Sequence, residues 1–176
     1  MVEDLTRLQL HLSAASALIK NYGNLTIKGE EEGSKLSFVT TAPSAANAYA
    51  SNTISNYGTI TVLSGIIENT TVGGACYALD NYAGSTATIK GGKLIAEKTT
   101  LRVFNWTDGE AAKATLNIQG GEIVSNDGYG VNLNLGNKPC VDLKITNGTI
   151  TTNDTDYNLA VYVVNKNSAE NILDIQ

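Results

Sequence analysis

The chain has 176 residues and a formal net charge of -5, with 17 Gly and only 2 Pro. A nucleic-acid-binding surface needs clustered Lys and Arg, so this charge balance argues against nucleic acid as a partner. An apolar content of 42% is too high for a disordered chain, and no apolar run approaches the roughly 20 residues that span a membrane.

The first 18 residues are compatible with two interpretations. Leu8, Leu10 and Leu12 alternate with polar residues as they would in a strand, which predicts a partial first coil over residues 1–18. The alternative is a helical cap over the same residues, because Leu5, Leu8 and Leu12 also follow helical spacing.

From residue 19 onward one short motif recurs. Its clearest copies are residues 19–27 and 54–62, which share Asn-Tyr-Gly followed by alternating apolar and Thr positions. Each copy closes on an apolar residue, and these are Ile27, Val62, Ile89, Ile118, Ile145 and Ile175. Successive members are 27 to 35 residues apart. A period in this range indicates stacked structural units.

Each repeat is predicted to hold three short strands. A glycine turn and a further apolar pair follow the closing residue, as in Gly120-Gly121-Glu122-Ile123. Within a strand, Leu116 and Ile118 alternate with polar residues, which is the pattern of a sheet with one buried face. We therefore predict an all-β fold over residues 19–176: a right-handed, single-stranded parallel β-helix of about six coils with three short strands each.

A recurring polar residue argues for the β-helix over an antiparallel sandwich, which also uses many short strands. One Asn in each of four repeats follows an inward apolar residue by two positions: Asn21, Asn56, Asn81 and Asn105. We predict that these four amides stack inside a corner of successive coils. In coils five and six the same slot is expected to hold Leu133 and Val163.

Two segments depart from the regular repeat. Residues 28–51, which include the acidic run Glu30-Glu31-Glu32, are predicted to leave the coil as a surface loop. The last residues, 173–176, match residues 116–119, after which another strand begins in the earlier copy. A bare final coil would expose unpaired strand edges, so the chain is expected to be a segment of a longer protein.

The motifs and the Gly-Gly-x-Ile turns resemble the right-handed β-helix repeats of the pectate-lyase-like superfamily across nearly the whole chain. The closest resemblance is to non-catalytic members in bacterial adhesin-like surface proteins and in phage fibre or spike proteins. This implies a structural or attachment module, located extracellularly, on a cell surface or on a virion surface. It also implies a homo-oligomer (trimer) or packing against other parts of a longer chain. The superfold hosts several functions, so the resemblance says little about activity.

Enzymes of this superfamily imply either a calcium-binding carboxylate cluster beside a basic residue or paired Asp residues near a His. The chain has two arginines, Arg7 and Arg102, and a single histidine, His11. The predicted outward slots of the motif do not assemble such a site; they hold Lys20, Ser55, Asp80, Phe104, Asn132 and Tyr162. We therefore predict no catalytic residues, no metal and no cofactor, and interpret Asp154-Thr155-Asp156 as an acidic turn. The alternative is part of a polysaccharide-degrading enzyme whose site lies partly outside this segment.

An aromatic residue follows each predicted inward Asn, which places four rings on the outside of successive coils: Tyr22, Tyr57, Tyr82 and Trp106. One interpretation is mutual stacking that stiffens a corner of the coil. The other is a flat platform that binds the sugar rings of a host or cell-surface glycan.

Overall fold

The computed structural model describes residues 7–11, 17–39, 51–72, 76–105, 113–135, 141–156, 159–165 and 172–175. Every regular element within these ranges is a β-strand. The strands are β1 (Arg7–His11), β2 (Ala17–Asn21), β3 (Asn24–Ile27), β4 (Lys35–Val39), β5 (Ser51–Asn56), β6 (Thr59–Val62), β7 (Ile66–Asn69), β8 (Cys76–Tyr82), β9 (Thr86–Ile89), β10 (Lys93–Ala96), β11 (Leu101–Asn105), β12 (Ala114–Ser125), β13 (Val131–Leu135), β14 (Val141–Thr152), β15 (Val161–Asn165) and β16 (Ile172–Ile175).

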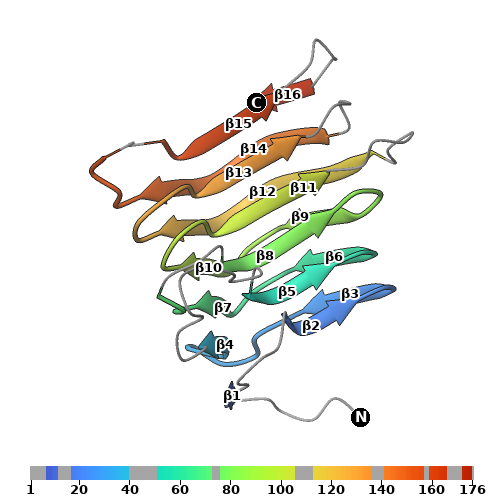
Figure 1. Ribbon diagram of the computed structural model, residues 1–176. Helices are drawn as coiled ribbons and strands as arrows, with labels where there is room; N and C mark the ends of the chain where they lie inside the picture. The colour runs from blue at the N-terminus through green and yellow to red at the C-terminus, as the bar shows by residue number, and fades with distance from the viewer. Residues whose placement is uncertain are drawn as a thin grey trace.

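The strands stack into parallel sheets as the chain coils from the N-terminus to the C-terminus (Figure 1). One sheet has the order β15-β13-β11-β8-β5-β2, so each strand pairs with its equivalent in the next coil. In the other sheet β3, β6, β9 and the first half of β12 form one side, and β4, β7, β10 and the second half of β12 form the other. Every pairing among the described strands is parallel, which confirms the predicted all-β solenoid.

The six closing residues form one column along the axis. Ile27 pairs with Val62, and Val62 with Ile89. Ile118 then joins Ile89 to Ile145, and Ile145 pairs with Ile175. The repeat was therefore assigned correctly at this position in all six coils, which we number one to six by these residues.

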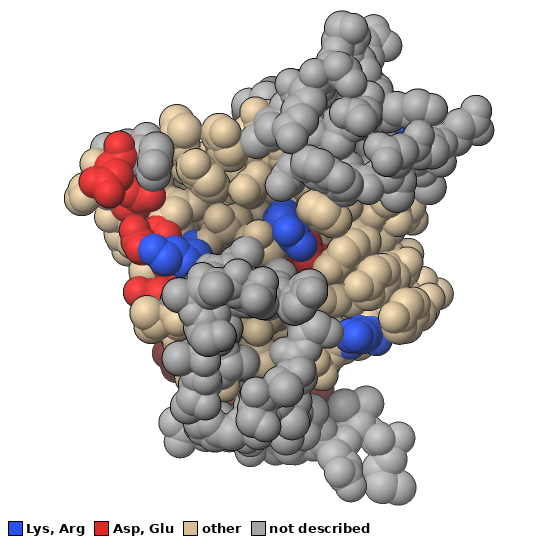
Figure 2. Space-filling view, in the orientation of Figure 1, with Lys and Arg blue, Asp and Glu red and all other residues tan. Residues whose placement is uncertain are grey.

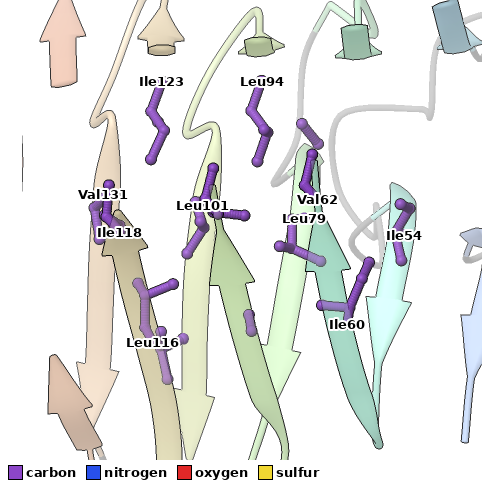
Figure 3. Close-up of a cluster of buried hydrophobic side chains, with 14 of the residues drawn as sticks. Ile54, Ile60, Val62, Leu79, Leu94, Leu101, Leu116, Ile118, Ile123 and Val131 are labelled. Carbon is purple, nitrogen blue, oxygen red and sulfur yellow. The ribbon is translucent and has the colours of Figure 1, made fainter. Parts of the chain in front are cut away.

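The hydrophobic core fills the space that the three strand positions enclose (Figure 3). Ile54, Leu79, Leu116 and Ile123 are among its completely buried side chains. The enclosed core extends over about four turns, fewer than the six coils predicted. The difference arises at the ends, where side chains such as Ile27 are only partly covered and Val163 is 44% exposed.

A ladder of buried amides runs beside this core in the first three coils. The Nδ2 of Asn21 donates a hydrogen bond to Oδ1 of Asn56 at 2.7 Å, and Asn56 donates in the same way to Asn81 at 2.7 Å. Each amide also reaches the backbone; Asn56, for example, donates to the carbonyl of Thr86 at 3.0 Å. A buried polar group is costly unless it is hydrogen-bonded, and these bonds satisfy the amides.

The fourth member predicted for this ladder was wrong. Val103, and not Asn105, pairs with Asn81, because Leu101 lies beside Leu79. The slot is therefore apolar from coil four onward, where Val103 pairs with Leu133. Leu133 and Val163 do occupy the slot in coils five and six, as predicted.

Glycine is required where the backbones of successive coils meet. Gly92 has φ +79° and Gly121 has φ +82°, a conformation that costs an L residue about 1–2 kcal/mol. A Cβ on Gly92 would also lie 2.6 Å from the carbonyl oxygen of Gly65 in the coil below. The Gly-Gly turns of the sequence therefore follow from both backbone conformation and close packing.

Two segments outside the central coils can be compared with their predictions. Arg7–His11 is a strand that pairs in parallel with β4, in register with Leu8 beside Leu36. The predicted loop over residues 28–51 was too long, because β4 occupies the third strand position and pairs with β7. The turn at Gly33 and the alternation of Leu36 and Phe38 are the sequence signals for β4. They are hard to recognise because this repeat is longer than the others. Residues 40–50 lie outside the described residues.

Candidate functional site

Three of the four predicted aromatic residues form a stacked column on the outside of the first three coils. The ring centroids of Tyr22 and Tyr57 are 4.9 Å apart with an interplanar angle of 9°. Those of Tyr57 and Tyr82 are 4.3 Å apart at 16°. The spacing follows from the pairing of Asn21, Asn56 and Asn81, each of which immediately precedes a tyrosine.

The next ring along this column is that of Phe104. Phe104 pairs in register with Tyr82, and the two rings meet edge to face at 6.0 Å. Trp106 lies outside the described residues. Phe104 takes this place for the same reason that Val103 pairs with Asn81: coil four enters the corner two residues earlier than its sequence motif suggested.

The orientation of the stack limits what it can bind. Because the tyrosine rings lie nearly parallel and face each other, their flat surfaces are largely covered by one another. The outer surface of the column consists mainly of ring edges and hydroxyl groups. Tyr22, which is 72% exposed at the end of the stack, is the ring with the most accessible surface.

A second cluster lies beside this column on the same sheet and is centred on Asp80, whose side chain is completely buried. The Nε of Arg102 donates to Oδ1 of Asp80 at 2.8 Å, and the Nη2 of Arg102 donates to Oδ2 at 2.6 Å. The Nδ2 of Asn52 donates to the same Oδ2 at 3.0 Å. The guanidinium also lies 4.3 Å from the ring centroids of both Tyr77 and Phe104. Both carboxylate oxygens of Asp80 are therefore engaged.

The surroundings of Asp80 shift the pKa values of Arg102 and of two neighbouring tyrosines. Burial lowers the pKa of Arg102, but the hydrogen bond and the charge of Asp80 outweigh it, so the pKa is raised overall. Burial, followed by the negative charge of Asp80 and hydrogen bonds to Asp80 and Tyr57, raises the pKa of the Tyr82 phenol. Burial also raises the pKa of Tyr77, although Arg102 opposes that effect. These shifts stabilise the charged form of Arg102 and the neutral phenols of Tyr77 and Tyr82.

This ion pair is not apparent from the sequence motif, because the motif places Phe104 in the outward slot of coil four. The structure places Arg102 there, in register with Asp80 on one side and Asn132 on the other. The other predicted outward residues pair as expected, with Lys20 beside Ser55 and Ser55 beside Asp80. Opposite charges at one slot of adjacent coils are the signal that a correct register would have revealed.

An open groove of about 830 Å³ follows the glycine turns at another corner. Gly65, Gly92 and Gly121 line it, and the acidic run Glu30-Glu31-Glu32 contributes to one side. On its rim Lys93 pairs with Glu122 at 2.9 Å. Figure 2 shows that most charged side chains on the face in view lie along one edge, with further Lys or Arg side chains near the middle and toward the opposite side.

The remaining candidates from the sequence are dispersed. His11 ends β1, far along the chain from the ion pair. In the acidic turn, the buried Asp154 accepts a hydrogen bond from the backbone N–H of Asp156 at 2.7 Å, so it orders its own loop. Within the described ranges no group of three or more His, Cys, Asp or Glu residues is arranged to hold a metal ion. Nor does that part of the chain contain a helix long and apolar enough to cross a membrane.

The fold and the two clusters define a parallel β-solenoid repeat protein. No protein-family model matches its sequence, and neither the curated proteins nor the solved structures yielded a match.

Proposed function

We propose that this chain is a non-enzymatic structural or attachment module of a phage fibre or a bacterial adhesin-like surface protein, acting outside the cell or on a virion. The observation that carries the proposal is the unbroken column from Ile27 to Ile175, in which every closing residue pairs with its equivalent in the next coil. Parallel strands that bond along the whole axis leave few places for local opening, and a surface rod requires that property.

The use of the charged groups supports the same function. Asp80 is enclosed and joined to Arg102 by two hydrogen bonds, which suits an immobile strut between coils. Glu68 pairs with Lys35 at 2.7 Å across β7 and β4. A general acid or base needs a proton-accepting atom that a substrate can reach, whereas these carboxylates are held by cations of the neighbouring coil.

The test is to incubate the purified chain with bacterial cells and, separately, with acidic polysaccharides. The proposal predicts saturable binding of the labelled chain to cells and no release of sugar. A chain carrying Ile118→Asp, which places a charge in the core, is the matched control and should lose binding together with its folded spectrum. Turnover of a polysaccharide by the chain alone would overturn the proposal in favour of the enzyme.

Glycan binding at the tyrosine column is the second candidate, and the exposure of Tyr22 favours it. The hydroxyl groups along the column could donate to sugar oxygens, and the outer face of Tyr22 could cover one sugar ring. A glycan array on the Tyr22→Ala and Tyr57→Ala variants tests this. Tyr162→Ala is the control, because Tyr162 stacks on Tyr129 at 4.4 Å in a different part of the same sheet. Equal glycan signals for all three variants would exclude the column as the binding site.

A further inference from the structure

A face of the solenoid unrelated to the two clusters carries a regular array of small polar side chains. It lies on β3, β6, β9 and the first half of β12. The inward residues of these strands are Leu25, Ile60, Ala87 and Leu116, so the residues on either side of each point outward. We call these outward residues the threonine face: Asn24, Thr26, Thr59, Thr61, Thr86, Thr88, Thr115 and Asn117.

The threonine face is a two-dimensional lattice. Asn24, Thr59, Thr86 and Thr115 pair in register as one column, and Thr26, Thr61, Thr88 and Asn117 form the other. Neighbouring strands are about 4.8 Å apart, and alternate residues of one strand are about 6.7 Å apart. The pairings are continuous in register over these residues, so both spacings repeat across four coils.

Threonine is favoured in solvated strands, and cross-strand threonine pairs are stabilising, which gives the array a purely structural explanation. That explanation does not account for its lack of charge. The adjacent face of the same coils, on β4, β7, β10 and the second half of β12, also has eight outward residues. Half of them are charged, namely Lys35, Glu68, Lys93 and Glu122. The threonine face has none, although both faces belong to the same sheet.

The chemistry of the threonine face fits ordered water better than a glycan. Each threonine offers one hydroxyl and one methyl group, and β-branching restricts its side-chain rotation. Sites for small organic ligands are concave and lined mainly by apolar and aromatic side chains, whereas this array is a sheet face of small polar residues without an aromatic ring. A charge would hold its own hydration shell and disturb any lattice of water above it. The prism face of hexagonal ice presents water oxygens at two perpendicular repeats of similar size to those of the array.

We propose that the threonine face binds ice. The methyl groups would hold water in a cage and the hydroxyl groups would anchor it, so that water ordered on the face merges with the crystal. The array ends at coil five, where Asp142 and Lys144 continue the two columns and interrupt the neutral pattern. The site therefore spans coils one to four and is independent of the tyrosine column and of the attachment function.

The experiment measures three properties of the full chain: partition into growing ice, inhibition of ice recrystallisation, and thermal hysteresis. The double variant Thr61→Lys and Thr88→Lys places two charges in the middle of the face and should abolish all three. The matched control is Ile66→Lys with Ile95→Lys, which adds the same charges to the adjacent face of the same coils and should leave them unchanged. Circular dichroism melts establish that each variant is folded.

If the first double variant does not fold, Thr59→Lys with Thr86→Lys tests the other column in the same way. Exclusion of the unmodified chain from ice would overturn the proposal, as would equal ice binding by the threonine-face and control variants. Binding to crystalline cellulose or chitin without binding to ice would also overturn it and assign the face to a solid polysaccharide instead.

Discussion

Asp80 and Arg102 face each other across adjacent coils and are joined by two hydrogen bonds of 2.8 and 2.6 Å. Asp80 is completely buried and the Arg102 side chain is only 12% exposed, so the carboxylate has no contact with bulk water and the guanidinium has little. Removing one partner of a buried ion pair leaves an uncompensated charge, whereas replacing both partners with neutral residues does not. Comparing the free energies of unfolding of the two kinds of variant measures what this pair contributes.

Replacing Arg102 alone with Met should destabilise the chain by about 3–5 kcal/mol, because it leaves the carboxylate of Asp80 buried without a counter-charge. The double variant Asp80→Asn with Arg102→Met removes both charges and should recover most of that loss. Urea denaturation of the two variants provides the comparison. A double variant as unstable as the single one would mean that the pair is not what Arg102 contributes.

The amide ladder should be sensitive at its middle member. Asn56→Ala removes the acceptor of Asn21 and the donor to Asn81 and Thr86, at about 1–3 kcal/mol for each buried group left unpaired. The Val103→Ala variant at the apolar end of the same slot should instead show only the cost of a smaller side chain. Chemical denaturation measures both, and an Asn56→Ala variant of unchanged stability would show that water replaces the amide.

Two glycines with almost the same backbone conformation separate conformational strain from steric contact. Gly33 has φ +81° and nothing within 4 Å of an added Cβ, so Gly33→Ala should cost only about 1–2 kcal/mol. Gly92 has φ +79°, but its Cβ would meet the Gly65 carbonyl oxygen. Gly92→Ala should therefore be clearly the more destabilising variant in thermal melts. Equal melting temperatures would contradict the close packing of these coils.

The pH dependence of stability should report the tyrosines beside Asp80. Burial and the charge of Asp80 raise the pKa of Tyr82 above its ordinary value, whereas the unfolded phenol titrates near about pH 10. The contribution of the protonated Tyr82 phenol to the free energy of unfolding is thus fully present below about pH 10. It declines as the pH rises toward the folded pKa, because the phenol loses its proton first in the unfolded chain. Tyr82→Phe should make the free energy of unfolding depend less steeply on pH above about 10, measured by urea denaturation. Parallel curves for the variant and the unmodified chain would contradict it.

The fold was predictable because the apolar residues that close each repeat keep one position in all six coils. The register of coil four was not, and the reason is geometric. A slip of two residues leaves every side chain on its original face, so Leu101 with Val103 and Val103 with Asn105 satisfy the same alternation. The two registers are distinguished only by the pairing of Leu101 with Leu79 in the folded chain.

The candidate sites depended on that register to different degrees. The tyrosine column was predictable, because Tyr22 and Tyr57 belong to nearly identical motifs. The contact between Asp80 and Arg102 was not, because it requires the correct alignment of β8 with β11. The neutrality of the threonine face could be recognised only once its strands were known to share one side of a sheet.

The amide ladder also gives the solenoid a net side-chain dipole along its axis. Asn21 donates to Asn56 and Asn56 donates to Asn81, so their side-chain dipoles point the same way along the axis and add. The amide of Asn81 accepts a hydrogen bond from Asn56 and donates one to the carbonyl of Thr115 in the next coil. Deleting the first coil removes the dipole of Asn21 and should therefore weaken the polarisation of the Asn81 amide two coils away. A column of apolar side chains would show no such effect.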